Sequence, residues 1–191
     1  LDVKTGNGAF MSDLARAEKL ARTMVEIGND AGVRTRALIT AMDVPLGLAV
    51  GNAIEVTESL EVLAGGGPSD LIELVIALAN EMLDIAGIDA DPREAITSGR
   101  AMDHWRRMVS AQGGDPDAPL PVARHQHVIT APVAGPLSTL EAYGVGVAAW
   151  RLGAGRAHKE DEIVHGAGVQ LHAKPGDMLS EGQPIMTLLA D

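Results

Sequence analysis

LDVKTGNGAFMSDLARAEKLARTMVEIGNDAGVRTRALIT, residues 1–40, is the stretch that decides the fold class. Residues 1–3 have the pattern of a strand end, and a glycine-rich turn follows. Apolar residues then recur at helical spacing from Leu14 to Ile27, which predicts a helix of about 17 to 19 residues with Ser12 as its N-cap and Gly32 at its end. Residues 33–40 are again strand-like. A strand, a helix and a strand in this order indicate a parallel crossover, and therefore an α/β fold.

Downstream of this unit the pattern is helical as far as residue 111. Gly and Pro residues separate candidate helices at residues 51–63, at 71–85, after Asp91-Pro92 and at 100–111. Residues 71–85 are apolar almost all round, which predicts a helix buried in the middle of the domain.

The texture of the sequence changes after residues 113–121, which hold two Gly, three Pro and two Asp and read as a linker. Short strand-like pieces follow: Val128-Ile129, Leu137, Val145-Gly146-Val147, Val169-Gln170-Leu171 and residues 185–188. We therefore predict two domains, residues 1–114 and 120–191. Both ends of the chain look like the middle of an element, so we expect the sequence to be part of a longer protein.

Composition narrows the classes of function. Hydrophobic residues make up 46% of the chain, and the aromatic residues are Phe10, Trp105, Tyr143 and Trp150, so the core must be aliphatic. The formal charge of −11 disfavours a nucleic acid or an anionic membrane as partner. Cysteine is absent, which excludes disulfides and thiolate metal sites and fits a cytoplasmic protein. No apolar run reaches the roughly 18 residues of a membrane helix.

Two glycine-containing segments are candidates for binding sites. The segment KTGNG at residues 4–8 fits an anion-binding loop before a helix or simply a tight turn, and it lacks the Walker spacing. The segment LGLAVGNAIEVTE at residues 46–58 offers backbone carbonyls and the Glu58 carboxylate, which are oxygen ligands for a hard cation. Taken alone, its residues favour an ordinary strand-to-helix turn.

Other potential site residues have simpler explanations. His125 and His127 would share one face of a strand, either as half of a metal site without an evident third ligand or as solvated side chains. No Gly-x-Ser-x-Gly or His-Glu-x-x-His motif is present. Residues 174–185, KPGDMLSEGQPI, resemble the closing half of a biotinyl/lipoyl-type barrel-sandwich. Lys159 and Lys174 lack the Met-Lys-Met hairpin of such carriers, so a structural element is favoured.

Six segments together resemble one family, the thymidine and pyrimidine-nucleoside phosphorylases, and they occur in the family's order along nearly the whole chain. They are DVKTGNGAFM (2–11), TAMDVPLG (40–47), VGNAIEV (50–56), GPSDL (67–71), LGAGR (152–156) and the run from Gly176 to Pro184. The resemblance implies the C-terminal portion of such an enzyme. It also implies the fold class: part of the central nucleoside phosphorylase α/β domain, followed by a C-terminal α+β domain with a barrel-sandwich-like element.

The family's reaction supplies the functional expectation. A phosphorylase of this kind is a pentosyltransferase that cleaves thymidine or another pyrimidine nucleoside with inorganic phosphate. The products are the free base and (2-deoxy)ribose 1-phosphate. The resemblance implies no organic cofactor, phosphate as co-substrate, a homodimer and a cytoplasmic location.

A few site residues carry over from the family. Phe10 matches a wall of the base pocket. The backbone carbonyls of Leu46 and Ala49 and the carboxylate of Glu58 match part of a monovalent-cation site, which would take potassium. The remaining cation ligands, the Lys-His-Ser phosphate loop and the Arg, Ser and Lys that hold the pyrimidine lie upstream in the family. We therefore expect no catalytic residue in this segment, and no activity from this chain alone. Asn7 stands where the family often has Ser.

Two alternatives remain open. A phosphoribosyltransferase of related fold would share the α/β part, but the anthranilate type lacks a C-terminal barrel-sandwich domain. A non-catalytic, carrier-like module would rest on residues 120–191 and on modification of Lys159 or Lys174.

Overall fold

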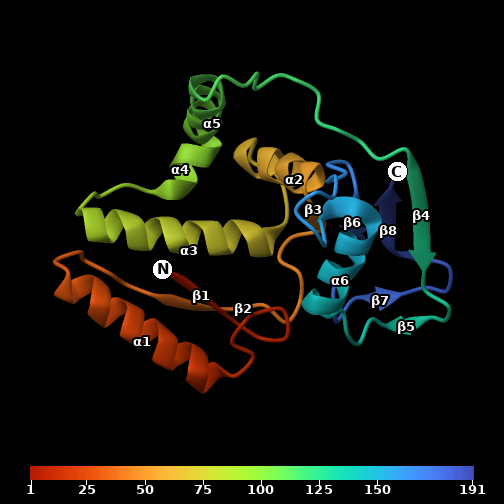
Figure 1. Ribbon diagram of the computed structural model, residues 1–191, viewed down its shortest axis with the longest axis horizontal. Coiled ribbons are helices and arrows are strands. Elements are labelled where there is room, and N and C mark those ends of the chain that lie inside the picture. The colour runs from red at the N-terminus through yellow and green to blue at the C-terminus, as the bar shows by residue number, and fades with distance from the viewer.

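The computed structural model describes residues 1–191, and its first part contains the predicted parallel crossover (Figure 1). Strand β1 (Asp2–Thr5) leads through helix α1 (Leu14–Asp30) to strand β2 (Leu38–Ala41). The two strands are parallel, with Asp2 opposite Leu38 and Thr5 opposite Ala41. Val3, Ala17 and Ala21 form the small core between α1 and the strands.

The boundaries of this unit differ slightly from the prediction. The N-cap of α1 is Asp13, not Ser12, and its side chain accepts a hydrogen bond from the Arg16 N–H at 2.9 Å. Strand β2 begins at Leu38 instead of residue 33. The Asn29 side chain accepts a hydrogen bond from the Thr35 N–H at 3.0 Å, so the chain before β2 forms a turn that side-chain bonding stabilises.

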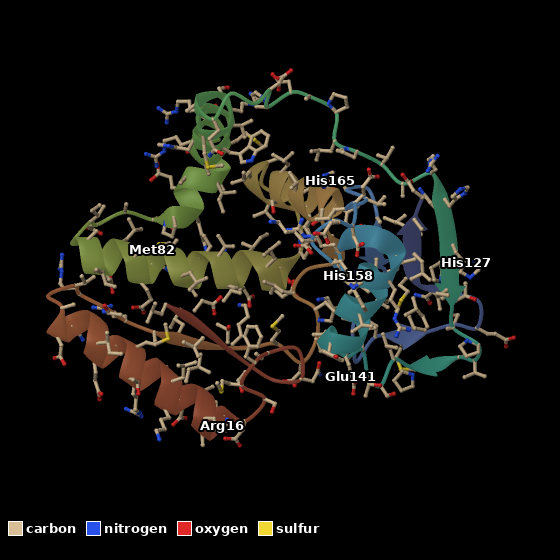
Figure 2. All side chains as sticks on the ribbon, viewed as in Figure 1. Arg16, Met82, His127, Glu141, His158 and His165 are labelled. Atoms are coloured by element: carbon tan, nitrogen blue, oxygen red, sulfur yellow. The ribbon has the colours of Figure 1, made fainter.

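Four helices follow where the sequence predicts them. They are α2 (Ala53–Leu63), α3 (Ser69–Ala86), α4 (Pro92–Thr97) and α5 (Arg100–Ala111). The predicted burial of the third helix is wrong for this chain, because Ile76 is the only buried residue of α3 while Val75 and Met82 are exposed. Figure 2 shows Met82 on α3, away from the C-terminal strands. An apolar composition indicates that a helix needs cover, and residues 1–191 supply cover for only part of its surface.

The C-terminal part is built on an antiparallel sheet. Its elements are β4 (His125–Thr130), β5 (Gly135–Pro136), α6 (Ala142–Ala149), the π-helical turn η1 (Trp150–Ala154), β6 (Gly168–Leu171), β7 (Met178–Leu179) and β8 (Pro184–Ala190). The main sheet has the order β3-β6-β8-β4, and β5 pairs with β7. The predicted strand at Val145–Val147 is wrong: these residues lie in α6, where Val145 and Ala149 pack against Val169 and Leu171.

Strand β3 (Ala49–Gly51) connects the two parts of the chain. It lies in the first part of the sequence but pairs with β6, with Ala49 opposite Gln170 and Gly51 opposite Gly168. Leu48 and Val50 pack against the same core as α6. The fold is therefore mixed α/β, and the C-terminal sheet contains one strand from before the linker. No helix is long and apolar enough to cross a membrane.

Candidate functional site

The loops that carry the predicted site residues start at one edge of the parallel pair. Residues 6–11, the first turn, follow the carboxyl end of β1, and residues 42–48 follow the carboxyl end of β2. The two loops meet, because the Gly8 N–H donates to the Met42 carbonyl at 2.9 Å. Ligands of α/β proteins bind outside the carboxyl ends of parallel strands, so this edge is the expected place for a site.

The first turn is closed by bonds within the protein. The Asn7 N–H donates to the Asp43 carboxylate at 3.0 Å, and the Asn7 amide donates to the Asp43 carbonyl at 2.8 Å. Gly6 has φ +119°, and a β-carbon there would lie 2.7 Å from the Asp43 carboxylate. The backbone N–H groups of Asn7 and Gly8 already have partners, which favours the interpretation of residues 4–8 as a turn over an anion loop.

Asn7 also joins the first turn to the C-terminal part. Its amide oxygen accepts a hydrogen bond from the Tyr143 N–H at 3.0 Å, at the start of α6. The Asp43 carbonyl accepts a second one from the Ala142 N–H at 2.9 Å. A shorter serine side chain lacks the amide that makes the bonds to Asp43 and Tyr143 at once, so Asn7 gives this turn a connection that serine would not.

The predicted base-pocket residue lies at the tip of the first turn. The Phe10 side chain is fully exposed, so nothing in residues 1–191 encloses it. Its role as a wall of the base pocket stays a prediction.

The predicted cation ligands come together in one cavity. Leu46, Ala49 and Glu58 line a pocket of about 310 Å³ that Lys4 also reaches. Its other walls come from α3, through Leu71 and Leu74, and from α6, through Ala142 and Gly146. The sequence places these three residues up to twelve positions apart, and the fold brings them to one place.

Glu58 is a buried carboxylate in this pocket. One of its oxygens accepts a hydrogen bond from the Leu48 N–H at 2.7 Å. Burial raises the pKa of Glu58, and the backbone N–H groups of Leu48 and Ala49 offset this only in part. The neighbouring charges of Asp70 and Glu61 raise the pKa further. A cation beside this carboxylate would favour its ionised form, and backbone carbonyls with a carboxylate are the donor set that a hard cation prefers.

Gly47 lets the chain pass close to Glu58. It has φ +65°, and a β-carbon at this position would overlap the second oxygen of the Glu58 carboxylate. The Gly47 N–H donates to the Asp70 carboxylate at 3.2 Å. Glycine is therefore required here both for the left-handed backbone and for the close approach.

Asp70 and Lys174 form an ion pair beside this turn that sequence reasoning missed. The Lys174 ammonium lies 3.0 Å from the Asp70 carboxylate, and it also donates to the Pro45 carbonyl. Partial burial raises the pKa of Asp70, but the hydrogen bond and the charge of Lys174 outweigh it, so the net pKa is lowered. The sequence offers one weak signal, an aspartate in the first turn of a helix, and nothing that links it to Lys174.

The histidines form no such cluster. His125 and His127 lie on β4 with exposed side chains (Figure 2 labels His127), and no group of three His, Cys, Asp or Glu side chains is placed to hold a metal ion. His172 bonds to the Thr187 hydroxyl at 2.7 Å and so has a structural partner.

Comparison with known proteins decides the family. Residues 1–104 match the model of the glycosyl transferase family a/b domain, and residues 137–191 match the pyrimidine nucleoside phosphorylase C-terminal domain. The chain belongs to the family of thymidine and pyrimidine-nucleoside phosphorylases. The resemblance of the six sequence segments to this phosphorylase family is thereby confirmed.

Individual relatives match this chain along nearly its whole length. Thymidine phosphorylase of Mycobacterium tuberculosis strain CDC 1551 is 53% identical over 98% of this chain and 44% of the relative. Pyrimidine-nucleoside phosphorylase of Bacillus subtilis strain 168 is 44% identical over 100% of this chain and 47% of the relative. Pyrimidine-nucleoside phosphorylase of Staphylococcus haemolyticus is 44% identical over 98% of this chain and 46% of the relative. The chain thus spans less than half the length of these phosphorylases.

Proposed function

We propose that the protein to which residues 1–191 belong is a pentosyltransferase that cleaves thymidine with inorganic phosphate, giving thymine and 2-deoxyribose 1-phosphate. The observation that carries the proposal is the pocket of Leu46, Ala49 and Glu58 at the carboxyl edge of β1 and β2, in a chain of the phosphorylase family. The names of the relatives support pyrimidine nucleosides as substrates.

The chemistry asks for a preorganised site. Breaking the N-glycosidic bond leaves positive charge on the sugar, and phosphate must be held beneath the reacting carbon while the base departs with its negative charge stabilised. Residues 1–191 would supply one wall of this site: Phe10 toward the base, and the Glu58 pocket as structural support. The residues that bind phosphate and hold the pyrimidine would come from the rest of the polypeptide, so this chain alone would be inactive.

The Glu58 pocket would hold potassium. The Leu46 and Ala49 carbonyls and the Glu58 carboxylate would be its ligands from this chain, with further ligands from the rest of the protein. When bound, the ion would supply a fixed positive charge that holds the turn at residues 45–49 in place. We further propose that the protein uses no organic cofactor, acts as a homodimer and resides in the cytoplasm.

Two other functions have less support. A phosphoribosyltransferase would not account for the pyrimidine nucleoside phosphorylase C-terminal domain at residues 137–191. A lipoyl or biotin carrier would modify Lys159 or Lys174, yet the Lys174 ammonium is engaged with Asp70 and Pro45, and the exposed Lys159 lacks the Met-Lys-Met hairpin of such carriers.

A phosphorylase and a phosphoribosyltransferase are distinguished by the compound that donates the pentosyl group. The protein containing residues 1–191 is incubated with thymidine and phosphate, and separately with thymine and phosphoribosyl diphosphate, and the products are identified by chromatography. We expect thymine and 2-deoxyribose 1-phosphate in the first mixture and no nucleotide in the second. Nucleotide formation in the second mixture alone would replace the proposal with a phosphoribosyltransferase.

A further inference from the structure

Residues 45–51, the site segment, are held mainly from the C-terminal part of the chain. The Leu48 carbonyl accepts hydrogen bonds from the Leu171 N–H at 2.7 Å and from the Gln170 amide at 3.0 Å. Strand β3 continues this contact by pairing with β6. The segment that lines the Glu58 pocket is thus positioned by residues more than a hundred positions away.

Lys174 adds the only ion pair to this attachment. Its backbone is anchored in a tight turn, because the Lys174 N–H donates to the Asp177 carboxylate at 2.8 Å and the Asp177 N–H donates back to the Lys174 carbonyl at 3.1 Å. From this base the side chain reaches across to the Pro45 carbonyl and to Asp70, and only a quarter of it remains exposed.

Asp70 extends the contact to the next residues. One carboxylate oxygen takes both the Lys174 ammonium at 3.0 Å and the Gly47 N–H at 3.2 Å, while the other accepts the Leu71 N–H at 2.9 Å. Leu48 then donates to Glu58. Pro45, Gly47 and Leu48 therefore each have a hydrogen-bond partner. Lys174 contacts the first of them, Pro45, directly, and it reaches Gly47 through Asp70.

We propose that Lys174 is a positioning residue for the site: by fixing Pro45 and Asp70 it sets where Leu46 and Ala49 lie along the wall of the Glu58 pocket. The effect on catalysis rests on the proposed function, whereas the effect on the segment does not. The C-terminal part of the chain thereby acquires a role in this protein that needs no modified lysine. Its turn at residues 174–177 presents a fixed ammonium to the site segment.

A purely structural ion pair would behave differently. Partly exposed pairs contribute little to global stability, so losing one changes the melting temperature only slightly. A displaced site segment, by contrast, slows catalysis strongly, because shifts near 1 Å can cost a factor on the order of a hundred in rate. The two roles are separated by measuring local order and turnover alongside melting.

The first test measures hydrogen exchange in the full protein that contains this chain, following peptides from residues 43–50 and from α1. The variants are Lys174→Met, Lys174→Arg, Asp70→Asn and, as a control, Lys159→Met in an exposed loop. Exchange at residues 43–50 should rise at least fivefold in Lys174→Met and also rise in Asp70→Asn, with α1 unchanged. Exchange at residues 43–50 should stay within twofold of wild type in Lys174→Arg and should equal that of wild type in Lys159→Met.

Unchanged exchange at residues 43–50 in Lys174→Met would overturn the positioning role, whether or not the protein proves to be a phosphorylase. If Lys174→Met exchanges faster everywhere, the Asp70→Asn variant decides whether the effect is local. A rise in exchange confined to residues 43–50 in Asp70→Asn supports the proposal, and a rise throughout the protein contradicts it.

The second test measures turnover of thymidine with phosphate. We expect kcat to fall about tenfold in Lys174→Met, to recover in Lys174→Arg and to stay at the wild-type value in Lys159→Met. A wild-type protein without phosphorolysis would refute the proposed function but leave the exchange result standing. Faster exchange at residues 43–50 with unchanged kcat would refute the link between Lys174 and the site.

Discussion

The first turn (residues 6–11) and the site segment (residues 45–51) start from adjacent parallel strands but are stabilised in different ways. The first turn is tied at its base by Asn7 and Asp43, and its tip carries the fully exposed Phe10. The site segment is held along its length by Glu58, Asp70, Lys174 and β6. The difference indicates that one loop is completed within residues 1–191, whereas the other presents a side chain that has no partner here.

The largest effect should come from filling the space beside Glu58. Gly47→Ala combines a left-handed backbone with overlap of the carboxylate, and we expect a loss of about 3 kcal/mol in the free energy of unfolding. The matched control is Gly65→Ala, which has φ +91° and no atom within 4 Å of the new β-carbon, and should cost only about 1 kcal/mol. Urea unfolding of both variants checks this; equal losses would mean that the contact with Glu58 is unimportant.

Removing the buried carboxylate should come next. Glu58→Ala leaves the Leu48 N–H without its partner, and we expect a loss of about 2 kcal/mol. Exposed Glu61, one turn further along α2, is the control, and its replacement by Ala should cost less than about 0.5 kcal/mol. Thermal unfolding of the two variants measures the difference.

The response of the melting temperature to potassium should distinguish the effect of the Glu58 charge from the effect of its hydrogen bond. Glu58→Gln keeps an oxygen for Leu48 but removes the negative charge. If the pocket holds potassium, the salt should raise the melting temperature of the wild type and not of Glu58→Gln, compared with equal concentrations of a tetramethylammonium salt. The same rise in both proteins would place the potassium effect elsewhere.

Loosening the base of the first turn should have a smaller effect. Asn7→Ala removes the amide that joins Asp43 to Tyr143, and since these bonds are exposed we expect a loss of about 1 kcal/mol. Asn7→Ser should recover little of it. Urea unfolding is the measurement, and a serine variant as stable as wild type would show that the amide bridge contributes nothing.

Acid should weaken two ion-paired contacts, one at Asp2 in β1 and one at Asp70 beside the site segment, because the pKa of each of these carboxyl groups is lowered. Burial raises the pKa of Asp2, but its bonds to Lys4 and Thr40 lower it overall, and Lys174 does the same for Asp70. A lowered pKa gives stability that is present above the unfolded value, near 4, and is lost as the pH falls through the folded value. Asp2→Asn and Asp70→Asn should therefore each lose less stability than wild type between about pH 5 and pH 2, which acid titration followed by circular dichroism can measure.

The smallest effect on stability should come from Phe10→Ala. The side chain buries nothing in this chain, so melting of residues 1–191 should not change. If Phe10 forms a wall of the base pocket as proposed, the KM for thymidine in the protein containing this chain should rise several-fold. An unchanged KM would remove Phe10 from the substrate site.

The sequence predicts the local units well where periodicity is strong. Helix α1 and the crossover follow from apolar spacing, and the cap is misplaced by a single residue, from Asp13 to Ser12. The run Val145–Val147 suits a buried strand and a buried helix equally, because its neighbours are apolar on every side, and tertiary packing against Val169 selects the helix.

Contacts between distant residues are the part that the sequence does not reveal. Glu58 was identified through the resemblance of its segment, residues 46–58, to a family site. Taken alone, the residues of that segment favour an ordinary strand-to-helix turn. The Asp70–Lys174 pair joins residues 104 positions apart and has no local pattern. The exposed face of α3 shows the same limit, because composition indicates that the helix needs cover but not what provides it.

The most direct test of the proposed phosphorolysis is phosphate-dependent release of thymine from thymidine, measured side by side for residues 1–191 and for the longer polypeptide that contains them. The proposed reaction requires that the longer polypeptide release thymine only when phosphate is present, and that residues 1–191 alone release none. Release without phosphate, or release by residues 1–191 alone, would contradict it.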